Sequence, residues 1–146
     1  MRTRLLAYLL LSLLLSLLPA WRGAYAQEPE QHPIDRSLDA CIEKDPSTAG
    51  MVECIGRAYE SWDKELNRAY NELSRKLSPQ GRQALKAAQL EWIKYRDSEF
   101  KLIDSVYYGL QGTMYIPMRA DSRLKIVKSR ALELNDYLGL VGEHDK

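Results

Sequence analysis

The chain of 146 residues carries 21 basic and 20 acidic side chains, a formal net charge of +1, and 45% of its residues are hydrophobic. This length, once a leader is removed, fits one domain rather than several. The near-zero charge argues against electrostatic binding of nucleic acid, while the chain is long enough to bury a core. We therefore expect one folded domain that does not bind nucleic acid.

The first 26 residues have the order of a secretory signal peptide. Two arginines among the first four residues precede an apolar run over 5–18, and Ala24-Tyr25-Ala26 supplies the small-x-small site that signal peptidase accepts. The apolar run is short for a membrane span, which takes roughly 20 residues; an uncleaved anchor helix is the alternative.

We expect removal of residues 1–26 and a mature chain that starts at Gln27. This chain forms a single helical domain over 27–146, with its core over about 38–138, and is periplasmic or secreted without stable membrane insertion. The leader takes with it three arginines and no acid, so the formal charge becomes −2.

Both cysteines of the chain, Cys41 and Cys54, lie in the predicted mature part. Export to an oxidising compartment makes a disulfide between them the expected state, with a pair of free buried thiols as the alternative. Closing a loop of about 14 residues is worth about 3 kcal/mol in a chain-entropy estimate. The two cysteines have no partner histidines nearby and make a poor metal site, so we predict no bound metal.

Helical patterning begins with a short segment. We expect a helix over 34–43, ended by Asp45-Pro46, with Ser47 or Thr48 capping the next helix. That second helix is expected over 49–77, because its apolar residues recur at intervals of three and four, the period of one helix face. These residues are Met51, Ile55, Ala58, Trp62, Leu66, Ala69, Leu73 and Leu77.

A third helix is expected over 79–107. Ser78 can cap its start, and Pro79 fits the first turn because its missing N–H has no helical partner there. Since the connection from the second helix is tight, the two helices should run antiparallel. The apolar stripe of the third helix holds Leu85, Ala88, Trp92, Tyr95 or Arg96, Phe100, Ile103 and Tyr107.

The segment 109–116 interrupts this periodicity with two glycines and is unusually apolar for a loop. A last helix is expected over 117–138, ended by Gly139 and Gly142. Its apolar residues recur at intervals of four and three, which also suits packing against a partner helix; they are Ala120, Leu124, Val127, Ala131, Leu134 and Leu138. The predicted fold class is all-α: an antiparallel bundle of three long helices plus a short N-terminal helix tied by one disulfide.

Polar side chains share the core-facing stripes of two helices. They are Gln89, Trp92, Arg96 and Glu99 on the third helix and Asp63, Asn67 and Tyr70 on the second. We expect Arg96 to be partly buried and paired with Asp63 or another acid, while Asn67 and Gln89 satisfy the remaining donors. This network either only fixes the register of the helices or, through Trp92, Arg96 and Tyr70, lines a groove for a ligand or protein.

Catalytic chemistry has little support in the sequence. The two histidines of the predicted mature chain, His32 and His144, lie near its two ends, where no helix holds them rigidly. The sequence holds no nucleophile elbow, phosphate-binding glycine loop or zinc-binding histidine pair. We therefore predict no enzymatic activity, no catalytic residue and no cofactor.

Four motifs together resemble the LprI-type lysozyme-inhibitor family. They are the cysteine pair, Asp63-x-x-Leu66-Asn67-x-x-Tyr70-x-x-Leu73, Gln89-x-x-Trp92-x-x-x-Arg96-Asp97, and Arg130-x-x-x-Leu134. The resemblance covers roughly residues 38–134 and implies a short, exported, helical envelope protein. Many members have no known function, and the named member is a lipoprotein that inhibits lysozyme. Gln27 rather than a cysteine comes directly after the predicted cleavage site, so a lipid anchor is not expected.

The chain departs from this family at a second cysteine pair that members usually carry. One of those cysteines falls at Phe100 of this chain, and its partner falls near Ser122. The resemblance implies that packing of Phe100 replaces the bridge and that the loop before the last helix is less constrained.

The resemblance also implies a protein partner, a lysozyme-type glycosidase. A candidate interaction loop consists of Leu110, Met114, Tyr115 and Ile116, with Tyr115 as an anchor; alternatively these residues fold back over the end of the bundle. The other function considered is a periplasmic interaction module for another envelope, secretion or toxin partner. Such a module would use the last helix, including Leu124 and Leu134, as its contact face.

Overall fold

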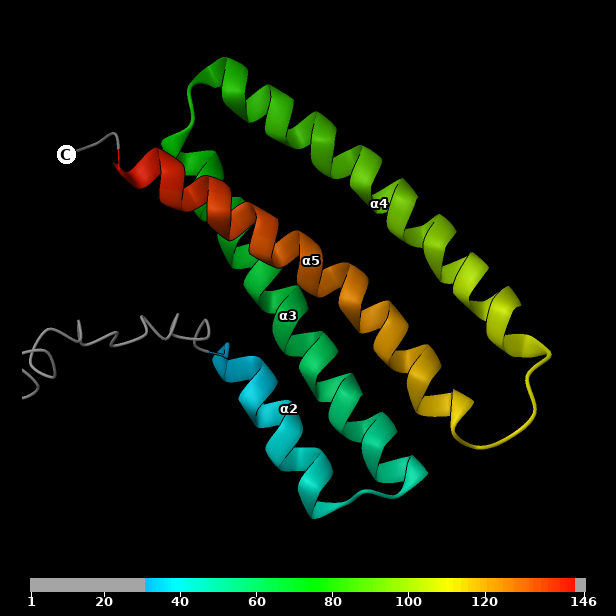
Figure 1. The fold of residues 1–146 in the computed structure, drawn as a ribbon. Helices are drawn as coiled ribbons and strands as arrows, with labels where there is room; N and C mark the ends of the chain where they lie inside the picture. Colours follow the sequence, from blue (N-terminus) through cyan, green and yellow to red (C-terminus); the bar gives the residue numbers. More distant parts are fainter. Residues whose placement is uncertain (1–30, 144–146) are drawn as a thin grey trace, which may run out of the picture. The chain divides into compact units, whose positions relative to one another are not determined.

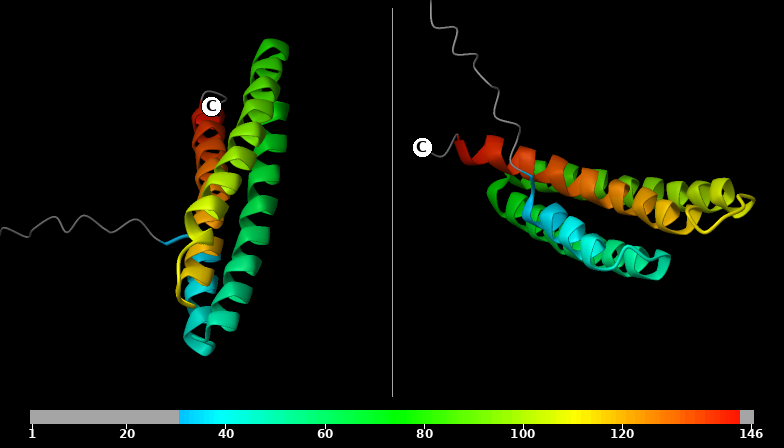
Figure 2. Two further views of the ribbon diagram at one scale, coloured as in Figure 1. Left: turned by 90° about the vertical axis from the view of Figure 1, so that its right-hand side faces the viewer. Right: turned by 60° about the horizontal axis from the view of Figure 1, so that its bottom comes forward.

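The computed structural model describes residues 31–143; the predicted signal peptide and His144 lie outside this range. The described chain forms four helices, α2 (Pro33–Lys44), α3 (Thr48–Lys76), α4 (Pro79–Tyr108) and α5 (Tyr115–Glu143), and contains no strand. Successive helices alternate in direction, so α3 and α5 run parallel to each other and opposite to α2 and α4 (Figures 1 and 2). The predicted all-α bundle of three long helices and a short leading helix is confirmed. None of these four helices combines the length and hydropathy that a bilayer crossing needs.

Two serine caps begin the long helices α3 and α4 where the sequence places them. The Ser47 hydroxyl accepts the Gly50 N–H at 3.0 Å, and the Ser78 hydroxyl accepts the Gly81 N–H at 3.2 Å. Glycine is required at position 50, because a Cβ there would clash with the carboxyl group of Asp45. The turn between α2 and α3 is therefore fixed by a cap and by close packing.

Helix α5 is longer at both ends than the sequence predicts. It begins at Tyr115, two residues before Pro117, because proline is tolerated in the first turn of a helix. It also continues through Gly139 and Gly142, so the expectation that these glycines end the helix is wrong. Glycine costs a helix about 1 kcal/mol relative to alanine, and the packing of Leu138 and Val141 against the core offsets this cost.

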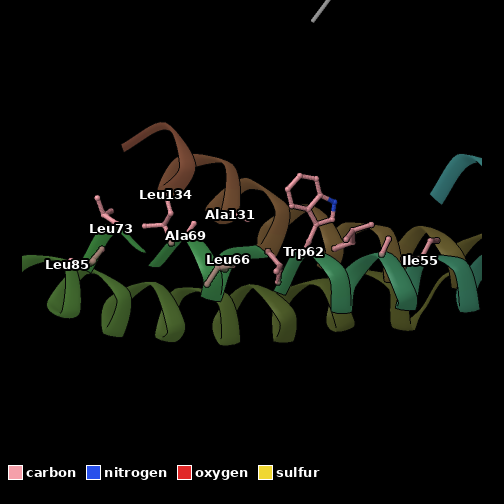
Figure 3. Packing of buried hydrophobic residues seen from close by; sticks show 11 residues of the cluster. Ile55, Trp62, Leu66, Ala69, Leu73, Leu85, Ala131 and Leu134 are labelled. Atoms are coloured by element: carbon pink, nitrogen blue, oxygen red, sulfur yellow. The ribbon is translucent and has the colours of Figure 1, made fainter. Parts of the chain in front are cut away.

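The core is formed mainly between α3 and α5. Figure 3 shows Leu66, Ala69 and Leu73 of α3 facing Ala131 and Leu134 of α5. The buried cluster consists of Ile55, Ala58, Trp62, Leu66, Ala69, Leu73, Leu85, Leu124, Val127, Ala131 and Leu134. The four-three stripe of α5 is thus covered by α3 within the chain, so it is not free to hold an external partner.

Helix α4 contributes less to the core than its periodicity suggests. Leu85 is the one residue of α4 that is buried, whereas Trp92, Phe100, Ile103 and Tyr107 are half-buried. Ala88 and Tyr95 of the predicted stripe are exposed. Because α3 and α5 already bury each other's apolar faces, α4 packs only along the side of this pair (Figure 1).

Helix α2 is attached to α3 by the predicted disulfide and by a partly buried polar contact. Cys41 and Cys54 are bonded, with their Cα atoms 5.7 Å apart. The indole N–H of Trp62 donates to Asp35 at 3.2 Å, and the Lys128 ammonium donates to the same carboxylate at 2.6 Å. Asp35 therefore joins α2 to both α3 and α5.

A polar cluster that the sequence analysis did not identify joins α3 to α5. Arg68 donates to both oxygens of Glu65, at 2.8 and 2.6 Å, and to the side-chain oxygen of Asn135 at 2.7 Å. Asn135 in turn donates to Glu65 at 3.0 Å. The bonds from Arg68, and to a smaller extent from Asn135, hold the pKa of Glu65 below its ordinary value against the opposing effect of burial.

Acid should weaken this connection, and Glu65→Gln should remove part of the effect. Because the pKa of Glu65 is lower in the folded state than in the unfolded chain, its contribution to stability is present above its unfolded pKa of about 4.5 and is lost as pH falls through the folded value. We expect the free energy of unfolding to fall less between pH 7 and pH 3 in Glu65→Gln than in the parent. Urea titrations at both pH values measure this, with Glu60→Gln on the exposed face of α3 as control; equal falls in all three proteins would contradict it.

Candidate functional site

A groove of about 610 Å³ lies between α3, α4 and the start of α5. Its walls are mainly apolar and aromatic, from Ile55 and Tyr59 of α3, Phe100 and Tyr107 of α4, and Tyr115 and Arg123 of α5. Burial raises the pKa of the Tyr59 hydroxyl above its ordinary value, against an opposing effect of nearby Arg96. The phenol of Tyr59 is therefore neutral at physiological pH.

The apolar segment predicted as an interaction loop borders this groove. We call residues 109–116 the tip; residues 109–114 form the loop, and Tyr115 and Ile116 belong to the first turn of α5. Three of the predicted side chains are exposed: Leu110 by 43%, Met114 by 60% and Ile116 by 54%. Tyr115 alone turns inward, with its ring centroid 6.4 Å from that of Tyr107. The tip is thus an open apolar surface.

Two arginines at the edge of the groove share one carboxylate. The Nε–H of Arg119 donates to Asp104 at 2.9 Å, and Nη2 of Arg123 bonds to both oxygens of the same group. The side-chain Nε of Arg123 is buried and, among residues 31–143, is the one buried side-chain polar atom without a hydrogen-bond partner. This group of three residues therefore carries a net charge of +1 and has unused donors.

The sequence patterns do not predict the group formed by Arg119, Arg123 and Asp104. The two arginines are four residues apart and share a face of α5, which is a local signal. Their acid lies 15 and 19 residues earlier in the chain, on α4. Only the antiparallel register of α4 and α5 brings the three together, and periodicity does not specify that register.

The predicted polar network divides into separate parts. Arg96 is partly buried, as expected, but it pairs with its neighbour Asp97, at 2.9 and 2.7 Å, rather than with Asp63. Its guanidinium lies over the ring of Trp92, 5.5 Å from the centroid. Asn67 donates to the side chain of Asp63 at 3.1 Å instead of serving Arg96. Arg96 and Asn67 thus each pair with an acid on their own helix and do not bond to each other's helix.

The buried cation of the motif is Arg130 rather than Arg96. Arg130 is 8% exposed, donates to Gln89 of α4 at 3.2 Å and pairs with Glu133 at 2.6 Å. Gln89 therefore serves Arg130, which ties α4 to α5 near the middle of the bundle. Tyr70 is half-buried against the core, and neither Tyr70, Trp92 nor Arg96 lines the groove.

Phe100 packs at the place where related proteins are expected to have a second disulfide. Its ring lies 6.4 Å from that of Tyr59, with the Arg123 guanidinium 5.2 Å from its centroid. Ser122 shares a hydrogen bond of 3.2 Å with the Tyr107 hydroxyl. Phe100 thus joins α4 to α3 through Tyr59 and to α5 through Arg123. The Tyr107–Ser122 hydrogen bond and the ion pairs of Asp104 also join α4 to α5 in this region.

A second hollow, of about 700 Å³, lies between α2 and α3 beside the disulfide. There Nη2 of Arg57 lies 2.7 Å from the sulfur of Cys41, and its Nη1 lies 3.3 Å from Glu53. Within the described part of the chain, no three His, Cys, Asp or Glu side chains are grouped so that they could hold a metal ion. The hollow offers no arrangement of groups that indicates chemistry.

These features define a class of small disulfide-linked helical bundles with an apolar, cation-edged groove. The chain belongs to the family described as lysozyme inhibitor LprI, whose family model matches residues 41–134. The family predicted from the motifs is therefore confirmed. The chain is also similar, at 32% identity and a TM-score of 0.72, to an uncharacterized protein from Burkholderia thailandensis known from a crystal structure. The similarity covers 77% of this chain and 56% of that chain, so this chain spans little more than half its length. No curated protein matches the chain.

Proposed function

We propose that the chain is an exported protein that inhibits a lysozyme-type glycosidase by binding it, without catalysis of its own. Membership of the lysozyme-inhibitor family supports this function. The observation that carries it is the exposed apolar tip, with Leu110, Met114 and Ile116 open to solvent at one end of the bundle. Large apolar side chains that remain exposed next to one another are typical of a protein contact surface.

The shape and charge of the tip suit the cleft of such an enzyme. A glycosidase holds two carboxyl groups in a concave site. The segment 105–120 contains no aspartate or glutamate and one arginine, Arg119. A protruding segment without acids can enter such a cleft without repulsion from its carboxylates, and Arg119 and Arg123 at its base are attracted to them.

Long-range attraction contributes little to this binding. The predicted mature chain has a formal charge of −2, which is too small to steer a charged partner strongly. The affinity must therefore come from contacts at the tip, and we expect it to depend weakly on salt.

The same proposal includes export and processing. Removal of residues 1–26 would leave one helical domain from Gln27, in the periplasm or outside the cell. The bond between Cys41 and Cys54 supports this location, because structural disulfides persist in oxidising compartments and are rare in the cytosol.

A negative charge placed on the tip should weaken inhibition strongly. We expect Met114→Glu to weaken inhibition of lysozyme-catalysed cell-wall lysis at least about tenfold, since it buries a charge and repels the carboxylates of the cleft. Leu140→Glu is the matched control, because Leu140 is also 60% exposed but lies near the end of α5. Lysis is followed by turbidity with several lysozyme types and micromolar protein purified from the periplasm.

Inhibition by the parent and by Leu140→Glu, together with its loss in Met114→Glu, would support the proposal. Absence of inhibition by the parent against every lysozyme type would reject it. Equal inhibition by both variants would reject the tip as the contact surface.

A further inference from the structure

One wall of the groove contains a helical glycine that packing does not explain. Gly56 lies inside α3 and lines the groove, and a Cβ built there would meet nothing within 4 Å. Glycine inside a helix is less favourable than alanine, and here no neighbouring backbone approaches closely enough to require it. The effect of Gly56 is to leave this wall without a side chain, which widens the groove.

The interior of the groove suits an apolar chain. Its volume of about 610 Å³ falls within the range of small-molecule sites, about 300–1,000 Å³. Ile55, Phe100 and Ile116 contribute apolar side chains, and the hydroxyl of Tyr107 is already bonded to Ser122. The hydroxyls of Tyr59 and Tyr115 and the two arginines are the other polar groups on its walls. A peptide backbone placed there would find few partners for its N–H and C=O groups, whereas an acyl chain brings no polar group to satisfy.

The charged side chains that line the groove favour one sign of ligand charge over the other. Arg119 and Arg123 are the charged residues that line it, and no acidic residue does so. Asp104 accepts bonds from both arginines and offsets one of the two charges. The two guanidinium groups retain N–H donors that Asp104 does not use. An anionic group at this edge is therefore attracted, and a cationic group is repelled.

We propose that this groove binds one single-chain amphiphile with an anionic headgroup, the acyl chain lying along Gly56 and the aromatic rings and the headgroup at Arg119 and Arg123. A fatty acid and an anionic lysophospholipid share this chemistry. The proposed ligand is distinct from a glycosidase partner, although Leu110 and Ile116 of the tip also line the groove.

The test measures binding by isothermal titration calorimetry to the oxidised protein purified from the periplasm. The probes are dodecanoate, 1-lauroyl lysophosphatidylglycerol, the neutral dodecyl maltoside and the cationic dodecyltrimethylammonium, each below its critical micelle concentration. We expect one molecule of either anion to bind at least about tenfold more tightly than the neutral probe, and no binding of the cation. The anion that binds more tightly indicates whether the ligand is a fatty acid or an anionic lysophospholipid. Lengthening the fatty acid from octanoate should raise the affinity about fourfold for each methylene group until the groove is filled.

Variants at position 56 test whether the probes bind in the groove or elsewhere on the surface. Gly56→Phe should abolish binding of the anions by filling the groove, while Gly56→Ala should retain it and raise the Tm. Arg119→Gln should remove the preference for anions over the neutral probe. Circular dichroism confirms that each variant is folded, and if Gly56→Phe fails to fold, Gly56→Leu replaces it.

Equal affinity for the cationic probe, or unchanged binding by a folded Gly56→Phe, would overturn the proposal. Failure of both anions to bind would also overturn it. No glycosidase is present in this experiment, so its failure is distinct from a failure of the inhibition assay.

Discussion

Trp62→Ala is expected to lower the free energy of unfolding by about 3–5 kcal/mol, the range for a large aromatic side chain removed from a core. Trp62 is 0% exposed, so its loss leaves a cavity between the helices. Its indole N–H also binds Asp35, and the Lys128 ammonium lies 5.5 Å from its ring centroid. The variant therefore loses both packing and part of the attachment of α2. Urea denaturation followed by circular dichroism measures the change.

Trp92→Ala is the matched control for this substitution. Trp92 is half-buried on α4, which packs only on the side of the α3–α5 pair, so its loss should cost clearly less than that of Trp62. Equal losses for the two variants would show that α4 contributes as much to the core as α3 and would contradict the fold described above.

Removal of the disulfide is the second large expected effect. The double variant Cys41→Ala/Cys54→Ala should lose about 3 kcal/mol, because an unlinked unfolded chain gains entropy. The bond joins residues that are 13 apart in the sequence. Helix α2 has no fully buried residue, so without the bond it is held mainly by Asp35 and by the half-buried Ile34 and Leu38.

Native-state hydrogen exchange measures which helices lose stability when the disulfide is removed. The amides of α2 should exchange faster in the double variant, while those of α3 and α5 keep most of their protection. Dithiothreitol should reproduce the effect in the parent and leave the double variant unchanged. A parent whose stability does not change on complete reduction would disprove the role given to the bond.

The helices could be predicted because the residues that specify each helix lie close together in the sequence. The stripe through Trp62 and Leu66 specifies the buried face of α3, and Ser47 and Ser78 specify where α3 and α4 begin. The glycines at the end of α5 misled the prediction, because tertiary packing of Leu138 and Val141 overrides local preference. Local rules thus locate the elements well and their last turns less well.

The contents of the candidate site were harder to predict. The position of the apolar tip was predictable from its glycines and apolar residues, but whether it is exposed or folded back was not. The groove was not, because its walls come from α3, α4 and α5 and depend on how far α4 stands from the other two. Arg96 was expected to pair with Asp63 or another acid; its partner is Asp97, which is adjacent in the chain and can bind it without any such constraint. A contact that depends on the register of two helices cannot be derived from the apolar periodicity of either helix alone.

The parallel pairing of α3 with α5 also decides when the protein can fold. Synthesis delivers a chain from its N-terminus, so the apolar face of α3 emerges long before residues 124–134 that cover it. Until α5 arrives, only α2 and part of α4 can shield that face, and the unfinished chain is exposed to aggregation. Release of the C-terminal helix is therefore the event that completes folding.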